Sequence, residues 1–210
     1  MIALSLAGDE RLRVLWGNQP LLDYVCADRE PLSSFRRPYM HPVHSLAGDL
    51  ITACCPDDHP WHKGISMTFS VLNDQNFWGG PTYRDGRYTQ LDNVGLVRHD
   101  AWDALDARGE QAVVRQRLSW ITAQGETWLR ERRAIDITVR QGVGWHMRWA
   151  MRFENISGRA LHFGSPATKG RAGAGYTGLF WRGSEPFQTG RAQLSDGHAG
   201  TVDDMNGTRA

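Results

Sequence analysis

The chain has 210 residues, of which 40% are hydrophobic and 22% charged, and its formal net charge at pH 7 is +1. That length supplies one full-sized hydrophobic core, and the near-neutral charge lacks the electrostatic signature of proteins that bind nucleic acid or acidic membranes. No apolar run approaches the ~18 residues that span a bilayer, and the first residues show no signal-peptide pattern. We therefore expect a soluble, cytoplasmic protein.

Along the chain, apolar and polar residues alternate with a period of two, as in half-buried antiparallel strands, and helical periodicity is scarce. The expected strands cover residues 11–16, 21–25, 50–54, 65–72, 113–121, 126–140, 144–155, 160–163 and 177–181. Turn sequences rich in Gly, Asp and Asn separate them at intervals of about ten residues. This arrangement predicts a single all-β domain over residues 1–210, either a sandwich or a barrel.

Residues 144–155 give the clearest strand pattern, because apolar side chains share one face and mostly polar side chains the other. The preceding strand, residues 126–140, places Glu131 and Arg133 on the same face as its apolar residues. Burying charges without a function is costly. Two interpretations stay open: a buried network of charges, or an apolar face that opens into a polar pocket.

The three cysteines predict neither a disulfide framework nor a zinc site. Cys54 and Cys55 are adjacent, and neighbouring side chains of a strand point to opposite faces, so a direct bridge between them is disfavoured. A reducing compartment fits this pattern.

Four of the eight histidines lie in two copies of His-Pro-x-His. In the first copy, prolines keep the chain extended, so His41 and His44 face opposite sides and cannot bind one ion together. We select His41 as the residue that joins the second copy, because Tyr39 shares its face.

The second copy belongs to the loop "PDDHPWHKG", which places Asp58, His59, His62 and Lys63 before the strand at residues 65–72. A histidine can transfer a proton near neutral pH, and an adjacent carboxylate can fix its tautomer. The same region could instead bind a divalent metal, the one candidate cofactor, through His41, His59 and His62. In a third interpretation the loop is an ordinary charged turn.

Two loops rich in aromatic residues, "QNFWGGPTYRDG" and "GYTGLFWRGSEPF", contribute Trp78, Trp181 and Arg182. Aromatic rings beside Arg and Asp form surfaces that stack on sugars and hold their hydroxyl groups, although plugs at the ends of a sandwich have the same composition. The only two lysines, Lys63 and Lys169, are added to these as substrate-binding candidates. Neither a phosphate-binding loop nor a Gly-x-Ser-x-Gly nucleophile motif is present.

The segment "RRPYMHPVHSLAGDLITACCPDDHPWHKGISMTF", followed by "NFWGG", "ERRAIDI", "LHFGSPATKGRAGAGYTGLFWRG" and "MNGTRA", resembles a bacterial family of uncharacterised proteins labelled "methane oxygenase PmoA". The resemblance implies a large antiparallel β-sandwich similar to the galactose-mutarotase-like supersandwich. Because members are usually longer, two interpretations stay open: a fragment of a longer sandwich that is incomplete at its C-terminus, or a short form that needs a partner to complete the sheet. The polar or aromatic positions that correspond to the family pattern are Tyr39, His41, Asp58, His59, His62, Trp78, Glu131 and Arg133.

The resemblance also implies an association with carbohydrate-processing proteins. We therefore expect an enzyme that acts on a sugar or modified sugar, with His41, Asp58, His59, His62 and Glu131 as catalytic candidates. Tyr39, Lys63, Trp78, Arg133, Lys169, Trp181 and Arg182 are the substrate-binding candidates. Epimerisation, mutarotation and elimination-type cleavage all need an acid and a base beside a ring carbon, so the reaction type stays open. The alternatives are a non-catalytic sugar-binding module and a metal-dependent oxygenase; a homo-oligomer is compatible with each.

Overall fold

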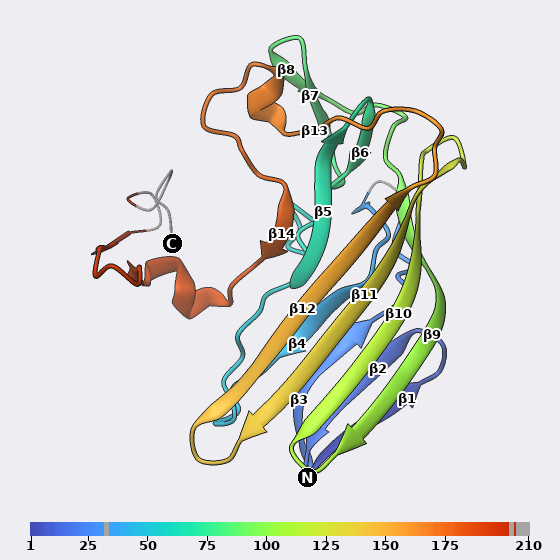
Figure 1. Ribbon diagram of the computed structural model, residues 1–210. Coiled ribbons are helices and arrows are strands. Elements are labelled where there is room, and N and C mark those ends of the chain that lie inside the picture. Colours follow the sequence, from blue (N-terminus) through green and yellow to red (C-terminus); the bar gives the residue numbers. More distant parts are fainter. Residues whose placement is uncertain (32–33, 202–203, 205–210) are drawn as a thin grey trace.

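The computed structural model describes residues 1–31, 34–201 and 204, and antiparallel β-sheet dominates this part of the chain (Figure 1). The first sheet follows the order β1-β2-β3-β4-β5-β13, and β6 and β14 also pair with β5. Its strands are β1 (Ile2–Ala7), β2 (Arg11–Trp16), β3 (Gln19–Val25), β4 (Tyr39–Val43), β5 (Ile65–Leu72), β6 (Gln75–Phe77), β13 (Phe163–Gly164) and β14 (Gly178–Trp181).

The second sheet has the order β12-β11-β10-β9, and its long strands cross in front of β1 to β4 in Figure 1. It contains β9 (Leu96–Arg108), β10 (Gln111–Ile121), β11 (Thr127–Arg140) and β12 (Gly144–Asn155). Smaller elements are the pairs β7 (Thr82–Arg84) with β8 (Arg87–Thr89) and β15 (Ala192–Gln193) with β16 (Ala199–Gly200), and the short 3-10 helices η2 (Pro166–Lys169) and η3 (Glu185–Thr189). In the described ranges no helix is long and apolar enough to cross a membrane.

The two sheets form a β-sandwich around a shared core. One cluster of buried side chains joins Leu12, Leu22 and Met40 of the first sheet to Ile135 and Val139 of the second. Each such side chain stabilises the fold by about 1.5–3 kcal/mol when it is fully buried. A second cluster, nearer to β5 and β6, is rich in aromatic residues: Phe35, Phe69, Phe77, Trp120 and Trp128.

A chain of polar side chains also crosses the space between the sheets. Arg133 donates to both carboxylate oxygens of Glu131, at 2.6 Å and 2.9 Å, and Trp120 Nε1 donates to Glu131 at 2.8 Å. Arg133 also donates to the Tyr24 hydroxyl at 2.9 Å, which in turn donates to Gln116 at 2.6 Å. Glu131 and Arg133 therefore belong to a buried network, the first of the two interpretations left open by the sequence.

The expected strands at residues 11–16, 65–72 and 144–155 are confirmed with the same bounds. The strand expected at residues 50–54 is wrong, because Leu50, Thr52 and Cys54 make only isolated bridges to different partners. The expectation of unpaired cysteines is also wrong, since Cys54 and Cys55 form a disulfide. Cys55 has φ +57°, so this segment does not keep the extended geometry on which that expectation rested.

Candidate functional site

The loop before β5 folds into two consecutive turns that bring its histidines together. His59 N donates to the carbonyl of Pro56, and His62 N donates to the carbonyl of His59, each at 2.9 Å. Cys55 N then donates to the carbonyl of His62 at 2.8 Å and closes the loop. As a result the imidazole rings of His59 and His62 stack, with centroids 4.8 Å apart.

Asp58 orients the first of these rings. Its Oδ2 lies 2.9 Å from Nδ1 of His59, so the carboxylate accepts the Nδ1–H hydrogen bond. This hydrogen bond holds the pKa of Asp58 below its ordinary value. The arrangement leaves Nε2 of neutral His59 as the ring atom with a free lone pair.

Arg182 fixes the second ring in the opposite tautomer. Its Nη1 lies 2.9 Å from Nδ1 of His62, and a guanidinium can only donate, so Nδ1 accepts and the proton resides on Nε2. Burial, with smaller electrostatic contributions from His59, Arg182 and Arg37, lowers the pKa of His62 to about 4. His62 is therefore neutral at pH 7 and presents an N–H donor beside the lone pair of His59.

Aromatic residues from distant parts of the chain surround the histidine pair. The His62 ring lies 5.7 Å from Trp78 and 5.2 Å from Phe180 of β14, and Trp78 packs against Tyr176 at 4.8 Å. Trp78 is only 8% exposed and packs on the interior side of the His62 and Tyr176 rings. Phe180 and Tyr176 are partly exposed. These rings form an apolar border on one side of the acid–base pair.

Buried charged residues pack against the interior side of the loop before β5. Lys63 is fully buried, forms an ion pair with Asp28, and lies 5.7 Å from the centroid of the Tyr39 ring. Burial lowers the pKa of Lys63 and raises that of Tyr39 to about 12. Arg37, which sequence reasoning missed, donates to the carbonyl of Trp61 at 2.7 Å. Lys63 thus supports the loop from the interior, and its expected role in binding substrate stays a prediction.

His41 does not join the other two histidines in a metal site. Its Nδ1 lies 2.9 Å from the hydroxyl of Thr52, and burial lowers its pKa. Among the described residues no group of three or more His, Cys, Asp or Glu side chains is placed to hold a metal ion. The guanidinium of Arg182 on His62 also disfavours a cation there, so these residues do not fit the three-histidine metal centre expected from the sequence.

Among the described residues, the remaining candidates make no hydrogen bond, ion pair or ring contact with His59 or His62. The side chains of Glu131 and Arg133 are buried in the core between the sheets and form an ion pair with each other. Trp181 is 48% exposed and packs against Phe187 at 5.0 Å, on the strand that also carries Phe180. Lys169 lines two smaller cavities of about 320 Å³ and 490 Å³.

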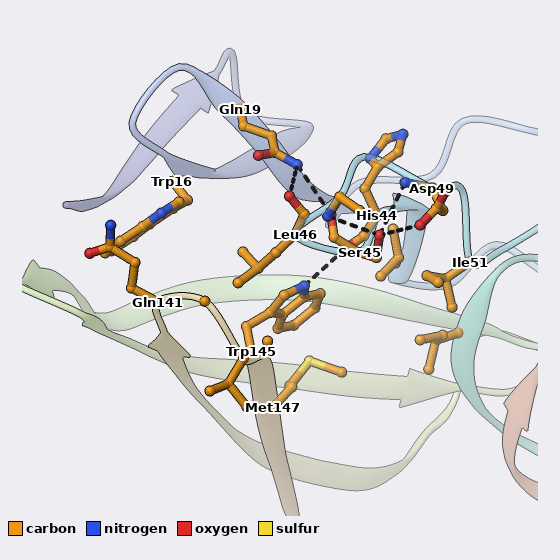
Figure 2. Close-up of a pocket in the computed structure, with 16 residues that line it drawn as sticks. Trp16, Gln19, His44, Ser45, Leu46, Asp49, Ile51, Gln141, Trp145 and Met147 are labelled. Atoms are coloured by element: carbon orange, nitrogen blue, oxygen red, sulfur yellow. Dashed lines mark hydrogen bonds between the residues drawn. The ribbon is translucent and has the colours of Figure 1, made fainter.

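A larger cavity, of about 920 Å³, lies at the end of the sandwich where the β11–β12 turn meets the loop after β4. Figure 2 shows Trp16 of β2 and Trp145 of β12 lining it from the two sheets. Gln19 donates to the carbonyls of Ser45 and Leu46, and Trp145 Nε1 donates to the carbonyl of His44 at 2.9 Å. Sequence reasoning missed this cavity, because its lining comes from four separate segments of the chain.

Comparison with known proteins identifies the family of the chain but gives no activity. No curated protein and no solved structure matches the chain. The model of a family described as "Family of unknown function (DUF6807)" matches residues 11–210, and the chain belongs to that family.

Proposed function

We propose that the protein is a carbohydrate-processing enzyme in which His59 and His62 act as base and hydrogen-bond donor on a sugar. The observation that carries this proposal is the opposite tautomers of the two stacked rings. Asp58 accepts a hydrogen bond from Nδ1–H of His59, which places the lone pair of the neutral ring on Nε2, and Arg182 leaves Nε2 of His62 protonated. A proton acceptor and a proton donor on adjacent rings are what proton transfer at a ring carbon or hydroxyl requires.

The surroundings of the pair support a sugar as the substrate. Aromatic faces stack on the C–H face of a sugar ring, and such faces are presented by Phe180, which contacts His62, and by Tyr176, which contacts Trp78. Because the pKa of His62 is about 4, this ring stays a neutral donor at pH 7 and stabilises an oxygen that gains negative charge. Epimerisation, mutarotation and elimination share this step.

The test is turnover of a panel of sugars by His59→Ala and His62→Ala variants. General acid–base catalysis contributes about 10²–10⁴-fold, so each variant should lose activity on that scale. His146→Ala is the matched control, because His146 is exposed on the outer face of β12. If both loop variants turn over the panel at the wild-type rate, the proposal is wrong.

The second candidate function is a non-catalytic sugar-binding module, and the cavity of Figure 2 favours it. Two tryptophans and the amide of Gln141 line that cavity, as in many sugar sites. Calorimetric titration separates the two functions: Trp145→Ala should abolish sugar binding in the module, whereas His59→Ala should leave it intact.

The similarity to the galactose-mutarotase-like supersandwich, the cytoplasmic location and a homo-oligomeric state stay predictions. The oxygenase activity implied by the PmoA label draws no support from the donor set around His62.

A further inference from the structure

Three arginines form a row across the outer face of the second sheet. The register places Arg132 of β11 directly opposite Arg117 of β10 and directly opposite Arg152 of β12. All three side chains are exposed, while the adjacent Glu131 and Arg133 point into the core. Residues that are directly opposite in an antiparallel pair have Cβ atoms about 4.5–5.5 Å apart, so three positive charges share one short row.

A neighbouring part of the same face shows the usual arrangement. There Asp136 lies opposite Arg148, and its Oδ1 is 2.6 Å from Nη2 of Arg115. Asp136 thus forms an ion pair with Arg115 and lies opposite Arg148, whereas the position between Arg117 and Arg152 in the other row holds Arg132. Like charges directly opposite each other destabilise a sheet.

The row is only partly neutralised by its surroundings. Arg117 Nε is 2.8 Å from Asp103, but in the described part of the chain neither Arg132 nor Arg152 has an acidic group within ion-pair distance. The three arginines line a groove of about 840 Å³. Other charged side chains that line it are Arg98, Asp100, Arg130 and Glu154. Positive charge therefore exceeds negative charge within the groove.

We infer that this groove binds a compact oxyanion, namely a phosphate, sulfate or carboxylate group carried by a small molecule. The guanidinium fork matches the oxygens of such a group, and Arg–oxyanion hydrogen bonds are among the strongest in proteins. A bound anion supplies the negative charge that the Arg132 position lacks. The same face also carries Asp103, Asp106 and Asp136, which would repel a long polyphosphate backbone, so a nucleic acid fits less well. The inference is independent of the histidine site.

The experiment measures thermal unfolding of the full chain in phosphate, sulfate and glucuronate, each at constant ionic strength maintained with NaCl. The wild-type protein should show saturable stabilisation, and Arg132→Gln should weaken the apparent affinity by about tenfold or more. Arg148→Gln, which lies opposite Asp136, is the matched control and should bind within about twofold of the wild type. Comparing the stabilisation by glucuronate with that by phosphate distinguishes a carboxylated sugar from a phosphorylated ligand.

A second readout tests the charge argument directly. In low-salt buffer without these anions, Arg132→Gln should unfold at a higher temperature than the wild-type protein, because the substitution removes like-charge repulsion. Sulfate and phosphate also stabilise proteins non-specifically, and that part should persist in the variant. The inference fails if NaCl alone reproduces the stabilisation, or if Arg132→Gln keeps the wild-type response to all three anions.

Discussion

The indole ring of Trp61 occupies the space that a side chain at Gly80 would fill. A Cβ on Gly80 would lie 2.6 Å to 2.7 Å from three ring atoms, and one on Gly79 would lie 2.5 Å from the Trp61 Cβ. Both glycines have positive φ, 62° for Gly80 and 105° for Gly79. Because Trp61 lies between His59 and His62 in the loop, the "WGG" sequence positions the histidine pair through this contact.

Replacing Gly80 with alanine should therefore disturb both stability and the site. The left-handed backbone costs a non-glycine residue about 1–2 kcal/mol, and the clash with the indole adds to this. We expect Gly80→Ala to lose roughly 2–4 kcal/mol in urea unfolding and to lower sugar turnover. Gly86→Ala is the control, because Gly86 has φ +81° but no atom within 4 Å of its Cβ position. Equal effects of the two substitutions would show that Trp61 plays no part.

The low pKa of His62 gives stability a defined pH dependence. Its folded pKa is about 4, below the ordinary 6.5, so between these values the unfolded chain binds a proton that the folded chain does not. Stability therefore falls as the pH decreases from about 6.5 toward 4. His62→Gln keeps an acceptor for Arg182 without this titration. Because His62 is partly exposed, the wild type should lose only roughly 1–2 kcal/mol more than the variant between pH 7 and pH 4.

Urea unfolding at several pH values measures this difference directly. Parallel stability curves for the two proteins across that range would contradict the lowered pKa of His62. His41 and His99 also have lowered pKa values, so both proteins should keep some slope.

The Asp58–His59 hydrogen bond predicts a loss of turnover without a loss of binding. Asp58→Asn should lower kcat by about tenfold or more with little change in KM, because the amide no longer selects the Nδ1–H tautomer. Asp57→Asn provides the comparison, since Asp57 is an exposed neighbouring carboxylate without a side-chain hydrogen bond in the described structure. An unchanged kcat in Asp58→Asn would show that Asp58 does not orient His59 for catalysis.

Glu131 should matter for stability and not for chemistry. Glu131→Gln leaves the buried guanidinium of Arg133 without its carboxylate, and breaking such a pair costs about 3–5 kcal/mol. The double variant Glu131→Gln, Arg133→Met should recover part of that loss in a double-mutant cycle. Turnover per folded molecule should stay at the wild-type level; a specific loss of kcat would restore the catalytic role expected from the sequence.

Local patterns in the sequence predicted the fold better than the site. Strand 144–155 was predictable because its alternation is regular, whereas β9 was missed because two register shifts against β10 interrupt the pattern of Leu96–Arg108. The Asp58–His59 pair follows from adjacency. The Arg182–His62 contact joins residues 120 positions apart, and the arginine row depends on cross-strand register. Single-sequence periodicity contains neither kind of information.

The Tyr24 hydroxyl has a consequence for how the two halves of the sandwich are aligned. Apolar contacts between sheets have no direction, so several relative translations would bury similar areas. Tyr24 donates to Gln116 on one strand and accepts from Arg133 on the next, and only one translation satisfies both hydrogen bonds in the dry interior. We therefore expect this single oxygen atom to select one alignment of the sheets, and with it the position of every loop at the ends of the sandwich.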